Sequence, residues 1–145
     1  MAPFWEKTTL EQLTPDQWEA LCDGCGRCCL QKLRHPTTGK VQYTWVACYL
    51  LDIETCRCTD YALRHILVPD CLALTAATIP ALRWLPRTCA YRLVAEKKPL
   101  PPWHPLISGD PRSVQTAGIS VRDRAISEQF VHPDDLESFY TQERF

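Results

Sequence analysis

The chain has 145 residues, a formal net charge of −1 and 46% hydrophobic residues. This length and composition are typical of one globular domain with a modest core, and they exclude a disordered chain. The balanced charge argues against a general attraction to nucleic acid or to anionic membranes.

Two residue types are unusually frequent, because the chain contains nine Cys and twelve Pro. Proline fixes φ and removes a backbone donor, so we expect short elements and long irregular connections. A chain of this kind needs a staple beyond its hydrophobic core. We therefore predict a mainly α, loop-rich, metal-stapled single domain over residues 1–145, with short strands. Its metal-binding part is predicted at about 20–95 and a C-terminal wrap at about 96–145.

The first predicted element is a helix over residues 15–21. Thr14 suits the N-cap, Pro15 suits the first helical position, and Gln17 can complete a capping box. This helix delivers Cys22 at its end. A loop is then predicted over residues 35–39, and a strand over 40–47, where β-branched and aromatic residues dominate.

The second half of the chain predicts short pieces. Residues 61–67 are expected to form a helical turn, and residues 72–85, interrupted by Pro80, two short helical pieces. Thr88 is predicted to cap a helix from Cys89 to about Lys97, with Leu93 and Val94 facing the core. Residues 100–105 are predicted as an extended connector.

Two more elements are expected near the end of the chain. Residues 118–121 are predicted as a brief strand. A final helix is predicted from Pro133 to about residue 141, with Asp134 and Asp135 in its first turn, where the helix dipole favours acidic side chains.

The cellular compartment decides between disulfides and metal ligation. The first ten residues include Glu6 and Lys7 and lack the apolar run of a secretory signal. We therefore expect a cytoplasmic protein with reduced thiols, and an odd cysteine count also disfavours disulfides. The expected partner is a metal ion, with no membrane or nucleic-acid partner, and a monomer is the default. The sequence does not identify a protein partner.

The strongest motif is a run of four cysteines within eight residues. Cys22, Cys25 and Cys28 are separated by two residues each, which lets a pair of thiolates reach one ion and also matches the first part of bacterial ferredoxin motifs. Neighbouring side chains usually diverge, so the adjacent Cys28 and Cys29 favour a two-metal or polynuclear arrangement over one zinc knuckle.

Five more cysteines follow downstream. Cys56 and Cys58 are too close for one zinc knuckle and indicate ligands to neighbouring metals. Cys89 is also explained as a core residue at the start of an amphipathic helix. The predicted metal ligands are Cys22, Cys25, Cys28, Cys29, Cys48, Cys56, Cys58, Cys71 and Cys89.

Other polar residues near the cysteines have weaker signals. Residues 24–51 contain four cations but no carboxylate, and such cations would stabilise thiolates, although an exposed basic loop explains them equally well. Carboxylates near the cysteines would favour iron, and a histidine could complete a site, but loop, capping, surface and core roles also explain them. These residues are Arg27, Lys32, Arg34, Lys40, Asp52, Asp60, Asp70 and His65.

The cysteine run resembles that of a bacterial family described as zinc- or iron-chelating and named after its CxxCxxCC motif. Cys58, Tyr61 and Arg64 look like part of the second motif of this family, with Cys71 as its later cysteine. A narrower resemblance to the YcgN-like group rests on residues 21–30, 84–93, 103–106 and 119–122 and spans nearly the whole chain. The resemblance implies a metal-binding protein.

The leading interpretation is therefore a cysteine-thiolate protein that binds zinc or iron, with an iron–sulfur cluster as one form of the metal. One alternative is an iron or iron–sulfur redox enzyme, in which residues such as Asp52 and His65 act beside the metal. Another alternative is a zinc-stabilised adaptor that presents Trp5, Trp18 and Trp103 to a protein partner.

Overall fold

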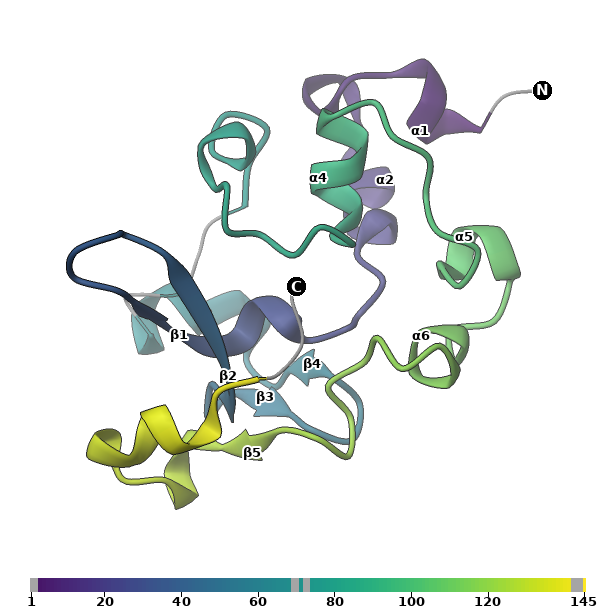
Figure 1. Ribbon diagram of the computed structural model, residues 1–145. Coiled ribbons are helices and arrows are strands. Elements are labelled where there is room, and N and C mark those ends of the chain that lie inside the picture. The colour runs from purple at the N-terminus through teal and green to yellow at the C-terminus, as the bar shows by residue number, and fades with distance from the viewer. Residues whose placement is uncertain (1–2, 69–70, 72–73, 142–144) are drawn as a thin grey trace. The chain divides into compact units, whose positions relative to one another are not determined.

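The computed structural model describes residues 3–68, 71, 74–141 and 145. The chain forms two compact units, and each unit combines two separate segments. Unit 1 comprises residues 1–24 and 73–119, and unit 2 comprises residues 25–72 and 120–145. Figure 1 labels the helices and strands of both units.

Unit 1 is built from short helices. Its α-helices are α1 (Phe4–Lys7), α2 (Pro15–Leu21), α4 (Ala90–Ala95), α5 (Pro105–Ser108) and α6 (Ser113–Thr116). Its 3₁₀ helices are η1 (Leu10–Gln12) and η4 (Ile79–Ala81). Each of these helices is too short to be stable alone, so tertiary packing has to hold them.

A hydrophobic core supplies that packing in unit 1. The buried members of this core are Leu10, Leu21, Ile79, Leu85, Ala90, Tyr91, Leu93, Val94 and Leu100. Trp18 of α2 lies against Tyr91 of α4, with ring centroids 4.6 Å apart. The Tyr91 hydroxyl also donates a 2.7 Å hydrogen bond to the Trp18 carbonyl, so the packed pair has its polar group satisfied.

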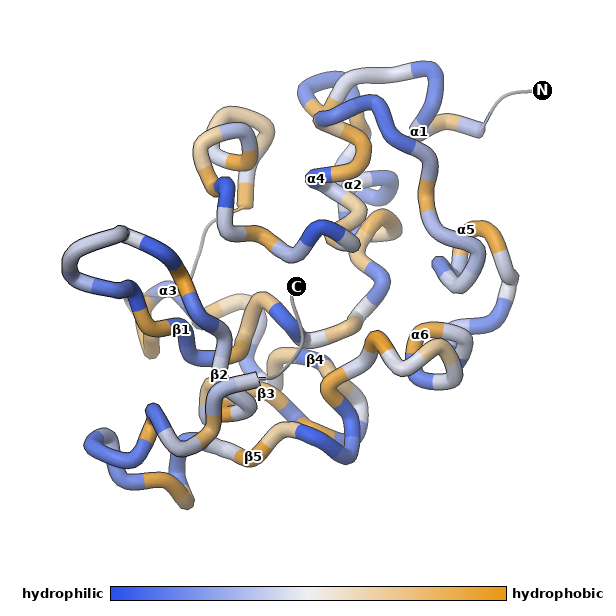
Figure 2. Tube along the Cα trace, in the orientation of Figure 1, coloured by the Kyte–Doolittle hydropathy of each residue, from blue (hydrophilic) through white to orange (hydrophobic). Residues whose placement is uncertain are grey.

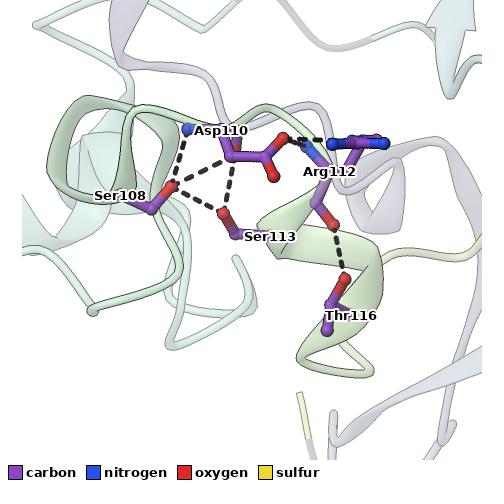
Figure 3. A network of polar contacts seen from close by, with 5 residues as sticks. All are labelled: Ser108, Asp110, Arg112, Ser113 and Thr116. Carbon is purple, nitrogen blue, oxygen red and sulfur yellow. Dashed lines mark hydrogen bonds and ion pairs between the residues drawn. The ribbon is translucent and has the colours of Figure 1, made fainter.

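A polar network joins α5 and α6 on the surface of unit 1 (Figure 3). Ser113 Oγ lies within hydrogen-bond distance of Ser108 Oγ, at 2.6 Å, and of the Asp110 carbonyl, at 2.7 Å. Asp110 Oδ1 accepts from the backbone N–H of Arg112 at 2.9 Å and also faces its Nε at 3.3 Å. These polar groups satisfy one another's hydrogen-bonding capacity locally. The network therefore stabilises the turn that connects the two helices.

Unit 2 contains two small sheets. The first has the order β1 (Leu30–Arg34), β2 (Val41–Ala47) and β5 (Ile126–Ser127), and the second pairs β3 (Leu51–Asp52) with β4 (Arg57–Cys58). The helical elements of unit 2 are η2 (Arg27–Cys29), η3 (Tyr61–Leu63), α3 (Arg64–Leu67), η5 (Glu128–Phe130) and η6 (Pro133–Phe139).

The strand register of the first sheet sets the position of the candidate site. β1 and β2 form an antiparallel hairpin in which Leu30 pairs with Ala47. β5 lies parallel to the other side of β2, with Ala47 beside Ser127. The turn over residues 35–40 that joins the hairpin is hydrophilic toward its ends and near neutral at its tip, with no hydrophobic residue (Figure 2). The cysteine-bearing segments adjoin the opposite end of the sheet, where Leu30 and Ala47 are buried.

Several predicted elements are confirmed. Helix α2 begins at Pro15, and Thr14 and Gln17 form the expected capping box, with Thr14 Oγ1 accepting from the Gln17 N–H at 3.2 Å. Strand β2 follows the predicted strand closely, and η3 with α3 covers the predicted helical turn. Leu93 and Val94 are buried, as predicted.

The predicted fold class is wrong, because the protein is not mainly α. Its helices are short, and the β1–β2 hairpin with β5 forms the framework of unit 2. Strand β1 was not expected, since its sequence, Leu-Gln-Lys-Leu-Arg, contains no β-branched or aromatic residue. Pairing with β2 overrides this weak propensity.

Other predicted elements differ from the structure in detail. The N-cap residue of α4 is Cys89, not Thr88. Two helical pieces were predicted over residues 72–85, but the described part of this range contains only the helix η4. Leu72 and Ala73 lie outside the described residues. Helix α5 replaces the end of the predicted extended connector.

The last two predictions also need correction. No strand forms over residues 118–121, all of which are described, because the Val121 N–H donates to the Cys25 carbonyl of a turn and joins no ladder. The final helix is the 3₁₀ helix η6. Among the described residues, no helix is long and apolar enough to cross a membrane.

Candidate metal centre

The cysteine run begins at the end of α2 and continues through a glycine turn into unit 2. Cys22 is the C-cap residue of α2 and is exposed, whereas Cys25 is the first residue of unit 2. Gly26 follows with φ of 78°, in the left-handed region that favours glycine. The Cys25 carbonyl accepts a 2.9 Å hydrogen bond from Val121, which fixes this turn against the C-terminal segment of unit 2.

Gly26 also lies too close to its neighbours for a side chain. A Cβ atom at this position would lie 2.6 Å from Val121 Cγ2 and 3.6 Å from Cys56 Cβ. Only glycine therefore satisfies both the backbone conformation and the space, and it allows η2 to start directly after the turn.

Five thiols of unit 2 interact electrostatically, and we refer to them as the cysteine cluster. Its members are Cys28, Cys29, Cys48, Cys58 and Cys71. A hydrogen bond with Cys28 and then burial raise the pKa of Cys29, and the charges of Cys28 and Cys48 raise it further. The Cys29 carbonyl also accepts from the Cys48 N–H at 2.9 Å, which holds the two cysteine-bearing segments together.

Cys48 leaves the end of β2 beside a carboxylate. Burial raises the pKa of its thiol, and the nearby charges of Glu128 and Cys58 raise it as well, while a backbone hydrogen bond from Leu50 lowers it. Cys58 is placed by β4, which pairs with the β3 strand that follows Cys48. These thiols therefore lie close enough to disfavour one another's ionised forms.

Cys71 reaches the cluster from the chain after α3. Burial raises the pKa of its thiol, the Arg64 guanidinium lowers it, and three other cluster thiols raise it. Its carbonyl lies 3.1 Å from His65 Nδ1. Arg64 also covers the Tyr61 ring, with its guanidinium carbon 3.7 Å from the ring centroid.

Lys32 supplies a cation inside the cluster. Its ammonium donates to the Cys28 carbonyl at 2.8 Å and to the Leu30 carbonyl at 2.7 Å, and it lies 5.1 Å from the centroid of the Tyr43 ring. Burial lowers the pKa of Lys32, and the charges of three cluster thiols raise it. The ammonium would therefore favour the thiolate forms that metal ligation requires.

The other predicted ligands occupy different surroundings. Cys56 is buried with φ of 57°, and its Sγ lies 3.2 Å from Ser120 Oγ. Cys89 packs against the hydrophobic core of unit 1. All nine cysteines fall in the described part of the chain, and none of them forms a disulfide there.

The cluster has suitable donors, but its geometry is not closed around an ion. Among the described residues, no group of three or more His, Cys, Asp or Glu side chains converges closely enough to hold a metal. The donor chemistry fits zinc or iron, because thiols from four separate segments meet in one part of unit 2. Ligation therefore requires these thiols to approach one another further.

The histidines serve as backbone caps or core residues. His35 Nδ1 accepts from two N–H groups of the β1–β2 turn, and His132 Nδ1 accepts from the Asp134 N–H at the start of η6. His104 is fully buried; its Nε2 donates to the Leu21 carbonyl at 2.7 Å, and its Nδ1 accepts from the N–H of Leu106. Both nitrogens of His104 are thus engaged, which suits a core role.

The structure separates the charged residues that the sequence grouped together. Asp52 caps the β3–β4 turn through hydrogen bonds from the N–H groups of Glu54 and Thr55, whereas Asp70 lies outside the described residues. Arg27 is buried with its guanidinium carbon 4.1 Å from the Phe145 ring centroid. Arg34 and Lys40 are exposed, so Lys32 is the member of this basic group that the cluster thiols contact electrostatically.

Comparisons with known proteins agree with the cysteine pattern. A family model named CxxCxxCC, with the description "Putative zinc- or iron-chelating domain", matches residues 21–90. A UPF0260 protein of Gluconacetobacter diazotrophicus is 57% identical over 90% of this chain and 82% of the relative. A UPF0260 protein of Azotobacter vinelandii is 56% identical over 93% of this chain and 91% of the relative. No solved structure matches the chain.

Proposed function

Since this chain belongs to the bacterial UPF0260 family and matches the CxxCxxCC domain, we propose that it binds zinc or iron through the thiolates of the cysteine cluster. The observation that carries the proposal is the electrostatic interaction among five thiols from four segments, three of which also interact with the Lys32 ammonium. Like-charged groups gathered in this way are a mark of functional sites.

The chain would hold the metal by thiolate donation, and Lys32 would offset part of the resulting negative charge. A divalent zinc or iron ion stabilises deprotonated thiols, so loading releases protons from the cluster. Ligation by Cys29, Cys48, Cys58 and Cys71 would tie η2, the end of β2, β4 and the segment after α3 to one point. The metal would thereby stabilise unit 2. Of the other five cysteines, Cys22, Cys25, Cys28 and Cys56 remain predicted ligands, whereas the core position of Cys89 favours a packing role.

The proposal is tested by metal analysis of untagged protein purified without air, together with a visible spectrum. We expect zinc or iron in stoichiometric amount. Cys48→Ala should lose most of this metal, whereas Cys89→Ala should retain it, because Cys89 packs against the core of unit 1. The pair is well matched, since each variant removes one half-buried thiol.

Different results would change the proposal in defined ways. Protein without zinc or iron that keeps its fold and shows nine titratable thiols would refute it. Equal metal loss in both variants would instead extend the ligand set to Cys89. Iron with visible absorption bands would direct attention to redox chemistry, whereas colourless stoichiometric zinc would favour a structural or regulatory site.

A further inference from the structure

A buried thiol outside the cysteine cluster links two segments of unit 2. Cys56 lies in the β3–β4 turn with φ of 57°, and its Sγ is 3.2 Å from Ser120 Oγ. Both side chains are buried, where the low local dielectric strengthens a hydrogen bond. This hydrogen bond therefore ties the β3–β4 turn to a segment 64 residues later in the chain.

Each proton in this link has its own acceptor. The Cys56 thiol donates to the Ile53 carbonyl at 3.7 Å. Ser120 Oγ accepts from the Arg122 N–H at 3.1 Å, which leaves its own proton for Cys56 Sγ. This arrangement uses a protonated thiol, whereas a cysteine that binds a metal must be a thiolate. The hydrogen bonds of Cys56 are therefore those of a structural thiol.

The segment held by Ser120 packs on the turn within the cysteine run. The next residue, Val121, is fully buried, and its N–H donates to the Cys25 carbonyl at 2.9 Å. A Cβ atom on Gly26 would lie only 2.6 Å from Val121 Cγ2, so the turn has no room to shift toward this side chain. The Gly26 carbonyl accepts from the Cys29 N–H at 3.1 Å, and the turn therefore sets where η2 begins.

We propose that Cys56 is a positioning residue rather than a ligand, and that its hydrogen bond with Ser120 fixes the turn from which η2 delivers two thiols of the cysteine cluster. This inference rests on the proposed metal binding. The sequence predicts Cys56 as a ligand because Cys58 is so near, but the thiol proton of Cys56 is used within the fold. A fixed start of η2 reduces the rearrangement that ligation by the cluster requires.

The test compares zinc affinity and X-ray absorption spectra of the full-length chain with those of three variants and a control. Cys56→Ser keeps a hydroxyl that can replace the thiol, so it should retain the number of sulfur ligands and nearly the affinity of wild type. Cys56→Val and Ser120→Ala break the hydrogen bond from either side, and each should keep the sulfur number but bind zinc about tenfold or more weakly. Ser138→Ala, at an exposed position of η6 in the same unit, is the control and should match wild type.

Two further measurements separate positioning from ligation and from general destabilisation. Because both residues act through one hydrogen bond, the double variant Cys56→Val with Ser120→Ala should bind zinc no more weakly than the weaker single variant. Affinities are compared under conditions in which circular dichroism shows every variant to be folded. In metal-free protein, hydrogen exchange of the Val121 N–H should speed up in Cys56→Val and in Ser120→Ala but not in Cys56→Ser.

The possible results distinguish this inference from the proposed function. Zinc that loses one sulfur ligand in Cys56→Ser would overturn the inference, make Cys56 a ligand and leave the metal-binding proposal intact. Wild-type affinity in both Cys56→Val and Ser120→Ala would also overturn it. A wild type that binds neither zinc nor iron would instead refute the proposed function itself. The sulfur number in Cys56→Ser decides even if Cys56→Val fails to fold.

Discussion

Gly26 combines two constraints that act on one residue. Its left-handed backbone disfavours any side chain, and a Cβ atom would overlap Val121 Cγ2 at 2.6 Å. Gly39 has a similar φ of 70°, but a Cβ atom there would meet nothing within 4 Å. Substitutions at the two glycines can therefore distinguish the cost of backbone strain from the cost of steric overlap.

We expect Gly26→Ala to lower the free energy of unfolding by about 2–4 kcal/mol, because strain and overpacking add. Gly39→Ala should lower it by ~1 kcal/mol from backbone strain alone. Urea unfolding of the two variants under the same conditions measures the difference. Equal effects at the two positions would mean that Val121 moves aside and that the turn is not closely packed.

The cluster thiols should make the metal-free protein sensitive to alkaline pH. The pKa values of Cys29, Cys48 and Cys71 are raised above the ordinary value of 9.0. A raised pKa means that the folded state favours the protonated thiol. The contribution of these thiols to the free energy of unfolding is therefore fully present below about pH 9, and it is lost as the pH rises through their pKa values in the folded state. Glu128 and the neighbouring thiols add to this effect by repelling new thiolates.

The melting temperature of metal-free protein should therefore fall as the pH is raised above 9, as measured by circular dichroism. Metal-loaded protein should lack this fall, because ligation already requires thiolates. The metal-free triple variant of Cys29, Cys48 and Cys71 to Ala is the control and should show a smaller decline. A metal-free wild type whose stability is flat from pH 8 to pH 10 would contradict the raised pKa values.

Strand and helix propensities explain which elements the sequence predicts. Strand β2 is rich in β-branched and aromatic residues, and α2 has its capping box, so local chemistry suffices for both. Strands β1 and β5 exist because β2 lies between them, and no local signal marks either one. For this reason the prediction of the fold class is wrong, and the sequence does not predict that Glu128 lies beside the segment that follows Cys48.

The capping box of α2 allows the contribution of a helix cap to stability to be tested. Thr14→Ala removes the acceptor for the Gln17 N–H and should lower the free energy of unfolding by about 1 kcal/mol. Thr14→Ser keeps the hydroxyl and should stay close to wild type, which makes it the matched control. Urea denaturation compares the three proteins. A stability of Thr14→Ala equal to wild type would show that tertiary packing of Trp18 alone holds the helix.

The two units depend on different sources of stability. Unit 1 has a hydrophobic core of nine buried residues, whereas the cysteine cluster lies wholly in unit 2. The sequence predicts thiolates as the metal ligands, because the spacing of the thiols is visible in it. It does not predict which thiols gather, since the surroundings of Cys56 and Cys89 are set by Ser120 and by the unit 1 core.

We therefore expect metal removal to loosen unit 2 and to spare unit 1. Chelation should speed hydrogen exchange in residues 28–34 and 41–48 by at least about tenfold, equivalent to ~1.4 kcal/mol of local stability. Exchange in α4 should remain unchanged, because the hydrophobic core that it packs into lies in unit 1. Mass spectrometry of peptides from both units provides the measurement. Equal acceleration in α4 would mean that the units unfold together.

The chain alternates between its two units, since residues 1–24 and 73–119 form one and residues 25–72 and 120–145 form the other. No single cut can therefore release an intact unit as a fragment. The same alternation affects synthesis on the ribosome, where all nine cysteines emerge before β5 has been translated. During that interval the nascent thiols lack the strand that completes their sheet, and they are then most open to oxidants and to unsuitable metals.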